Sequence, residues 1–171
     1  MNRLIPPIVL STLVLLLFSC SRQFAVTVNN QAVYDPRYQP NSLPVQDADL
    51  QGCINLALRQ QGLQNPADLT VLSCSNSNVR SLDGIEQYTG LKFLDLADNR
   101  ITNLQPLAGM SQLNGLSIPN NPLTDISVLL RMGGLTASIL SGNQQIPCGQ
   151  LDALQRKLGE NLSRPQSCRG R

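Results

Sequence analysis

Residues 91–112 read LKFLDLADNRITNLQPLAGMSQ, and residues 113–134 read LNGLSIPNNPLTDISVLLRMGG. Each block has 22 residues, with apolar side chains at the same seven positions and an asparagine at the ninth. The start of each block alternates between inward apolar and outward positions, which is the periodicity of a β-strand. Because so short a strand is unstable alone, we expect it to stack on the equivalent strand of the next block. The repeat therefore predicts a solenoid of parallel strands.

The blocks before and after these two follow the same 22-residue pattern less strictly. The block from Leu69 retains the apolar positions but has Ser77 at the ninth position, and the block from Leu135 reaches Asn143 before it diverges. Irregular outer repeats are typical of the ends of a solenoid. We therefore assign residues 69–147 to about four coils.

These blocks resemble the internalin type of leucine-rich repeat, L-x-x-L-x-L-x-x-N-x-I-x-x-L. The resemblance implies the α/β class and a short solenoid with parallel strands on its concave face, and it says little about function. We expect Asn99, Asn121 and Asn143 to lie buried where the chain bends, forming a ladder of hydrogen bonds to backbone groups of their own and adjacent coils. We interpret them as structural residues, and a ligand contact as the weaker alternative.

Both ends of a solenoid need covering, because bare strand edges and exposed leucines promote aggregation. The spacing of Leu50, Ile54 and Leu58 predicts a helix over about 48–61, within an N-terminal cap of residues 47–68. A second apolar helical face, formed by Leu151, Leu154 and Leu158, predicts a C-terminal cap over residues 148–171.

The chain has five cysteines, which divide into one near the N-terminus and four in the repeat region and its caps. We predict the disulfides Cys53–Cys74 and Cys148–Cys168, because the other pairings would join opposite ends of the solenoid. An all-cysteine zinc site is the alternative, but the spacing lacks a close C-x-x-C pair. We expect no metal and no cofactor.

The N-terminus predicts export. Residues 1–19 have a short basic start and an apolar stretch, as in a secretory signal peptide, and the stretch is too short for a stable transmembrane helix. Residues 17–20, LFSC, resemble a bacterial lipobox, which implies cleavage before Cys20 and its attachment to lipid. Ser21 after that cysteine implies the outer membrane by the same resemblance. An ordinary signal peptide, with Cys20 left as a spare thiol, is the alternative.

Residues 20–46 are expected to form a lipidated N-terminus and a flexible tether, because they are rich in proline, asparagine, glutamine and serine. A short strand over residues 24–28 is the one element that we expect there.

Composition excludes several functions. The chain has no histidine, so a serine–histidine triad, a cysteine–histidine dyad and histidine-ligated metals are excluded. After removal of the predicted signal peptide, which contains only Arg3, 12 basic residues face 11 acidic ones, so charge does not suggest nucleic acid as a partner. We predict that the chain is not an enzyme.

The outward strand positions form the surface that solenoids use for partners. We expect that surface, whose outward positions include Val71, Gly115 and Ala137, to be small and mostly polar, weakly apolar at Phe93 and Ile139, and without a pocket around its carboxylates. Phe93 is the first candidate anchor because aromatic residues dominate binding hot spots. The candidate binding residues are Lys92, Phe93, Asp95, Asp98, Asn114 and Ile139. A solvated polar surface with no partner is the alternative.

Together these features predict a monomeric, non-catalytic protein-binding module in the bacterial envelope. Acyl chains on Cys20 would attach it to the lipid bilayer, facing the periplasm or the cell surface, and its partner would be an envelope or extracellular protein. The alternative is a structural lipoprotein that maintains the envelope without a specific binding face.

Overall fold

The computed structural model describes residues 26–28, 31–34 and 42–168, and the chain divides into two compact units, residues 1–39 and 40–171. The predicted signal peptide, Cys20 and Ser21 lie outside the described residues. In the first unit, β1 (Val26–Val28) pairs with β2 (Gln31–Tyr34) as an antiparallel hairpin. A strand was expected where β1 lies, but β2 was not, so the prediction of a flexible tether is wrong over this hairpin.

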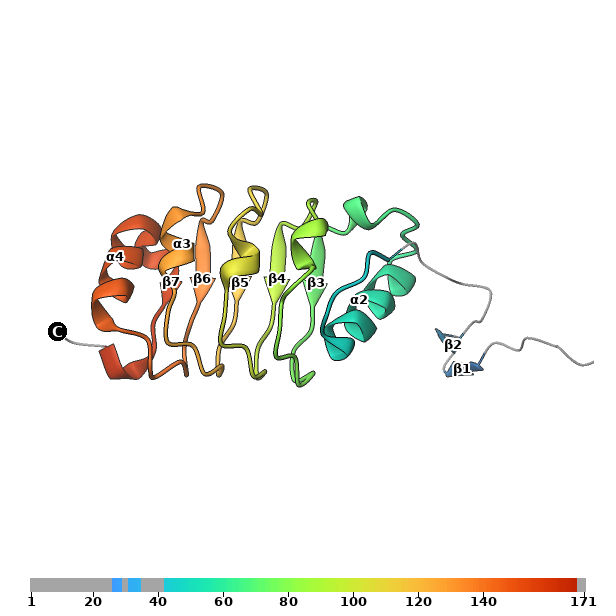
Figure 1. Cartoon of the computed structure of the whole chain (residues 1–171), viewed down its shortest axis with the longest axis horizontal. Coiled ribbons are helices and arrows are strands. Elements are labelled where there is room, and N and C mark those ends of the chain that lie inside the picture. Colours follow the sequence, from blue (N-terminus) through green and yellow to red (C-terminus); the bar gives the residue numbers. More distant parts are fainter. Residues whose placement is uncertain (1–25, 29–30, 35–41, 169–171) are drawn as a thin grey trace, which may run out of the picture. The chain divides into compact units, whose positions relative to one another are not determined.

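The second unit is a short leucine-rich-repeat solenoid of the α/β class, as the repeat predicts (Figure 1). Its parallel sheet has the strand order β3-β4-β5-β6-β7. The bounds are β3 (Val71–Ser73), β4 (Phe93–Asp95), β5 (Gly115–Ser117), β6 (Ala137–Ile139) and β7 (Leu162–Ser163). The fifth strand, β7, comes from the C-terminal cap and was not predicted.

The register of the sheet follows the repeat, because each central residue pairs with the residue 22 positions later. Leu72 pairs with Leu94, Leu94 with Leu116, and Leu116 with Ser138. These side chains are buried, so the three leucines form a continuous apolar ladder through the core. Ser138 interrupts the ladder: its hydroxyl is buried and has no hydrogen-bond partner among the described residues.

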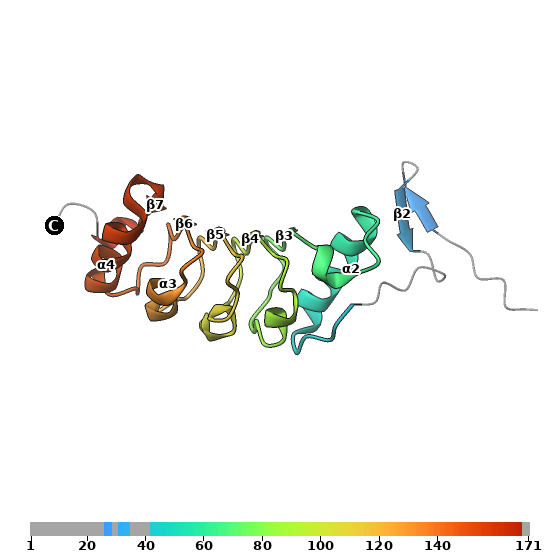
Figure 2. The same ribbon diagram turned by 90° about the horizontal axis from the view of Figure 1, so that it is seen from above.

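Short helical segments form the side of the solenoid opposite the strands (Figure 2). They are η2 (Ile85–Gln87), η3 (Gln105–Leu107) and α3 (Ser127–Arg131). The second half of each repeat has room for only one or two turns. Pro106 is the second residue of η3, within the first turn, where a missing N–H costs nothing. The buried Ile85, Leu107 and Leu129 attach these segments to the core.

A helical cap covers each end of the solenoid (Figure 1), as predicted. At the N-terminal end, α2 (Ala48–Gln60) buries Leu50, Ile54 and Leu58, and η1 (Pro66–Asp68) follows it. At the C-terminal end lie α4 (Cys148–Leu158), η4 (Gly159–Asn161) and η5 (Gln166–Cys168). The buried face of α4 consists of the three leucines expected from the sequence.

Disulfides Cys53–Cys74 and Cys148–Cys168 lock the two caps, in the predicted pairing. The first joins α2 to the coil that follows β3, and the second joins the start of α4 to η5. Each closes a loop of about twenty residues, which is worth about 3 kcal/mol on the chain-entropy model.

The folded unit begins earlier than the predicted boundary at residue 47. Val45 packs against the core, and the backbone N–H of Gln46 donates to the carbonyl of Asp83 at 3.0 Å. The hydroxyl of Tyr88 donates to the carbonyl of Leu43 at 2.8 Å. Residues 43–46, assigned to the tether from sequence, are therefore part of the N-terminal cap.

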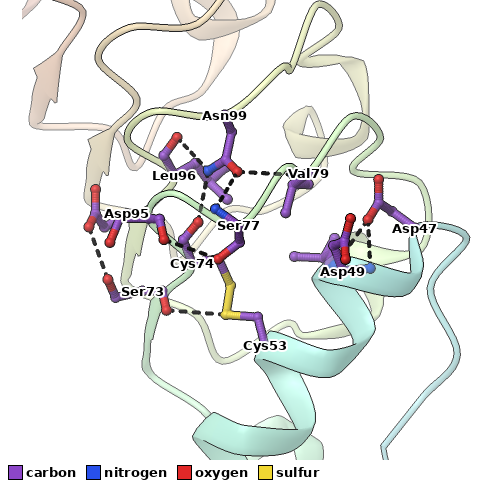
Figure 3. The surroundings of a disulfide bond; sticks show 12 residues. Asp47, Asp49, Cys53, Ser73, Cys74, Ser77, Val79, Asp95, Leu96 and Asn99 are labelled. Atoms are coloured by element: carbon purple, nitrogen blue, oxygen red, sulfur yellow. Dashed lines mark hydrogen bonds between the residues drawn. A yellow bond between two sulfur atoms is a disulfide. The ribbon is translucent and has the colours of Figure 1, made fainter.

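The N-terminal cap also protects the open edge of the sheet at β3. The side-chain amide of Gln61 donates to the carbonyl oxygen of Val71 at 3.2 Å. The sulfur of Cys53 lies 3.2 Å from the carbonyl oxygen of Ser73 (Figure 3). Helix α2 and its disulfide therefore lie beside the edge of β3 that β4 does not pair.

Asp47 connects α2 to the first coil. One carboxylate oxygen accepts from the backbone N–H groups of Asp49 and Leu50, both at 3.0 Å, and so caps the helix (Figure 3). The other accepts from those of Arg80 at 2.8 Å and Ser81 at 3.2 Å. Burial raises the pKa of Asp47, but the four N–H donors together outweigh it and hold the pKa below its ordinary value of 3.8.

We expect Asp47→Asn to lower the free energy of unfolding at pH 7 by about 1–3 kcal/mol, because one amide oxygen replaces two charged acceptors. The folded-state pKa is depressed, so the ionised carboxylate stabilises the fold above pH ~4, the ordinary unfolded value. That stabilisation is lost as the pH falls through the folded-state pKa. Denaturant titrations should therefore show a gap between the two proteins at pH 7 that closes towards pH 2.

The matched control is Asp49→Asn, which removes an acidic side chain from the same helical turn. It should change stability by only a few tenths of a kcal/mol, through the helix dipole. A gap between wild type and Asp47→Asn that stays constant from pH 7 to pH 2 would contradict the assigned role.

Candidate interaction surface

The concave face carries an apolar groove of about 270 Å³. Its walls are the three residues of each strand from β3 to β6, together with Asn161 of η4. Three large apolar side chains in these walls are exposed, Val71 at 48%, Phe93 at 54% and Ile139 at 45%. The expectation of a mostly polar face without a pocket is therefore wrong.

Phe93 owes its position to a glycine on the next strand. A Cβ atom added to Gly115 would lie 2.6 Å from Cδ1 of the Phe93 ring. The ring therefore lies over the space that any other residue at 115 would fill. Gly115 and Ala137 leave a low floor between the large side chains of Phe93 and Ile139.

Asp95 is the charged residue in the walls of the groove. Its Oδ2 accepts from the hydroxyl of Ser73 at 3.0 Å (Figure 3), and its Oδ1 accepts from the backbone N–H of Ala97 at 3.3 Å. These bonds fix the carboxylate at the carboxyl end of β4 without using all of its acceptor capacity.

The predicted candidate residues divide into two sets. Phe93, Asp95 and Ile139 line the groove together, whereas Lys92, Asp98 and Asn114 do not line it. Asp98 lies in the turn after β4 with φ 57° and accepts from the side chain of Asn120 at 2.8 Å. Asn114 donates through its side chain to the carbonyl of Gly134 at 3.1 Å. Asp98 therefore belongs to a turn, and the side chain of Asn114 links two neighbouring coils.

Sequence reasoning did not single out Val71, Gly115 and Ala137 as binding residues, although it placed all three at outward strand positions. The signal was the alternation of each strand, which puts Val71 and Ala137 in one row with Phe93. The depth of the groove depends on the small residues Gly115 and Ala137 and on the orientation of the Phe93 ring, which strand alternation does not reveal.

The buried asparagines form the hydrogen-bonded ladder expected of structural residues. Asn99 accepts at Oδ1 from the backbone N–H groups of Ser77 and Val79, and donates to the carbonyls of Cys74 and Leu96 (Figure 3). Asn121 and Asn143 make equivalent bonds in the next two coils. All three are buried, and none is among the residues that line the groove.

Ser77 takes the place of asparagine in the first coil and cannot reach the preceding chain. Its hydroxyl donates to the carbonyl of Ser75 at 3.0 Å. The first coil instead receives support from Asp47 in the cap, through Arg80 and Ser81. The N-terminal cap thus supports the first turn at these two backbone groups.

The described residues also lack the features of two other kinds of function. Among residues 26–28, 31–34 and 42–168, no three cysteine, aspartate or glutamate side chains are grouped closely enough to hold a metal ion. Within the same ranges, no helix has the length and apolar character needed to cross a membrane.

Comparisons with known proteins agree with this architecture. A family model for leucine-rich repeats, in two copies, matches residues 67–109 and 89–131. The chain therefore contains leucine-rich repeats, and its fold is typical of non-catalytic, protein-binding modules. Among curated protein sequences, none matches the chain.

Two solved structures of Listeria monocytogenes internalins are similar to this chain. Internalin C2 is 26% identical with a TM-score of 0.53, over 58% of this chain and 47% of that one. An internalin (inlF) is 27% identical with a TM-score of 0.61, over 72% of this chain and 37% of that one. The chain thus spans less than half the length of these two internalins.

Proposed function

We propose that this chain is a protein-binding module of the bacterial outer membrane, attached through acyl chains on Cys20, and that the concave groove is its binding site. The observation that carries the proposal is the exposed Phe93, which stands in an apolar groove on the face that leucine-rich repeats use for partners. Isolated exposed apolar residues are common on protein surfaces, but a row that lines a hollow is typical of binding sites.

On the other side of the solenoid, the hollow between η2 and η3 is lined mainly by polar side chains, which include Asp83, Glu86, Asn103 and Gln105. Of the large apolar side chains in the described solenoid, those exposed by more than a third include Val71, Phe93 and Ile139 in the groove. Because those three come from the first, second and fourth strands of the sheet, a ligand that contacts them would cross several coils.

Site-specific photo-crosslinking in living cells tests the binding site. A photo-reactive phenylalanine analogue at Phe93 should form a covalent adduct with a defined envelope or extracellular protein. The matched control is the same analogue at Ala108, which is exposed at the end of η3 on the opposite side. Equal and diffuse adducts at both positions would show that the solenoid acts as a spacer and would overturn the proposed site.

Intact-mass measurement of the protein purified from membranes tests the anchor. The expected species begins at Cys20, carries the added mass of acyl chains, and has four further cysteines that alkylate only after reduction. Cys20→Ala should release the protein from the membrane fraction. A species cleaved elsewhere, or one without acyl mass, would remove the anchor from the proposal and leave the groove to be judged by crosslinking.

A further inference from the structure

A second hollow adjoins the groove at its N-terminal end. It lies between α2 and the carboxyl end of β3 and is lined by Asp49, Cys53, Leu56 and Ser75, among others. We call it the Leu56 hollow. Ser73 lines both the groove and the Leu56 hollow, so the two form one continuous surface from β6 to α2.

Most of the exposed large apolar side chains gather on this surface. The described residues include five such side chains, and four of them line one of the two hollows: Leu56, Val71, Phe93 and Ile139. The fifth, Leu43, lies elsewhere, on the N-terminal cap. Small residues separate the large apolar side chains of this surface. Such a surface favours a ligand that inserts individual apolar side chains between them over a ligand that packs against it as one flat face.

The shape limits what can occupy the surface. The groove, at about 270 Å³, and the Leu56 hollow, at about 510 Å³, are open to solvent and adjoin at Ser73, unlike the single enclosed pocket typical of a small-molecule site. Strands β3 to β6 are about 4.8 Å apart, so crossing them takes about 14 Å. An extended peptide covers that distance with about four or five residues. The hollows therefore suit a short extended segment that inserts alternate side chains.

The charges that line the surface have one sign. Asp95 lines the groove and Asp49 lines the Leu56 hollow, and no lysine or arginine is among the described residues that line either one. Lys92 precedes β4, whereas Asp95 ends it. A ligand that crosses the strands at the level of Asp95 and Asp49 would gain from positive charge.

We infer that the groove and the Leu56 hollow together bind an extended segment of a partner protein in which every second residue faces this surface, and in which the facing residues are apolar, basic and apolar in turn. An apolar side chain occupies the space between Phe93 and Ile139, above Gly115 and Ala137. A basic side chain pairs with Asp95, and a second apolar side chain contacts Leu56 and Val71. This inference rests on the proposed function, since it names the chemistry of the partner for the same site.

The test uses the purified full chain and three fluorescent eight-residue peptides, each with three probe residues at every second position and serine elsewhere. The probe residues are leucine, lysine and leucine in the leucine–lysine peptide, leucine, glutamate and leucine in the leucine–glutamate peptide, and serine, lysine and serine in the serine–lysine peptide. Fluorescence anisotropy should show saturable binding of the leucine–lysine peptide only. Phe93→Ser should weaken that binding by about tenfold or more, because a buried aromatic anchor is lost. Asp95→Asn should weaken it by about two- to fivefold, with the effect shrinking as salt is added.

Leu43→Ser is the matched control, because it removes the exposed apolar side chain that lies outside both hollows. It should leave the affinity unchanged. Equal binding of the leucine–glutamate peptide, or of the serine–lysine peptide, would overturn the inference.

A second copy of this chain is the other conceivable occupant, and sedimentation velocity distinguishes it. A concentration-dependent dimer that Phe93→Ser abolishes would overturn the inference. The experiments distinguish failure of this inference from failure of the proposed function. A partner captured at Phe93 in cells, together with no preference for the leucine–lysine peptide, refutes the inference alone, whereas absence of any specific adduct refutes the binding site itself.

Discussion

Asn121→Ala is expected to lower the free energy of unfolding by about 3–5 kcal/mol, because several buried backbone groups lose their partners at once. The Oδ1 atom of Asn121 accepts from the backbone N–H of Ile101 at 3.0 Å. Its Nδ2 atom donates to the carbonyls of Leu96 and Pro119, each at 3.0 Å. Ile101 and Leu96 lie in one coil and Pro119 lies in the next. The substitution therefore weakens the contact between two coils and also the turn that contains Asn121.

Denaturant titration followed by circular dichroism measures this loss. Asn120→Gly is the neighbouring control. Asn120 is exposed and has a φ of 54°, in the left-handed region that glycine adopts without strain. The equivalent residue of the next coil is Gly142, so glycine is compatible with the backbone at this position. The control should cost less than about 1 kcal/mol. Comparable losses for the two variants would show that the buried ladder contributes no more than a surface turn.

Leu94→Ala is expected to cost about 3–5 kcal/mol, in the upper part of the range for buried leucines. Leu94 is 2% exposed and lies between Leu72 and Leu116 in the register of the sheet. The neighbouring coils hold it on both sides through the strand hydrogen bonds, so the core cannot collapse to fill the cavity that alanine leaves.

The matched control for this prediction is Leu56→Ala. Leu56 has the same side chain but is 46% exposed on α2, so the substitution should change stability by no more than about 0.5 kcal/mol. Thermal and denaturant unfolding of both variants measure the difference. A loss below 1 kcal/mol for Leu94→Ala would contradict the continuous leucine ladder.

The solenoid and its caps could be predicted from the sequence because they rest on periodicity. Leu94 and Leu116 recur at a spacing of 22 residues, and that spacing is also the register of the sheet. The caps follow from the need to cover both ends, and α2 ends within one residue of the predicted helix. Only one disulfide pairing keeps each bridge at its own end of the solenoid.

The surface was harder to predict, because it depends on contacts that no periodicity encodes. The Phe93 ring lies where it does in the groove only because Gly115 leaves room for it. Asp98 looked like a charged contact, but its backbone conformation and its bond to Asn120 make it part of a turn. Strand β7 was missed because it has two residues, too few for a recognisable alternation.

The N-terminal cap has a consequence for how the molecule behaves when many copies stand side by side. The side-chain amide of Gln61 donates a hydrogen bond to the carbonyl oxygen of Val71. This oxygen lies at the edge of the sheet that could otherwise pair with a further strand. With α2 and its disulfide beside the same edge, neighbouring molecules cannot extend the sheet from one copy into the next. The N-terminal cap therefore opposes head-to-tail polymerisation of the solenoid through its sheet, even at high local concentration.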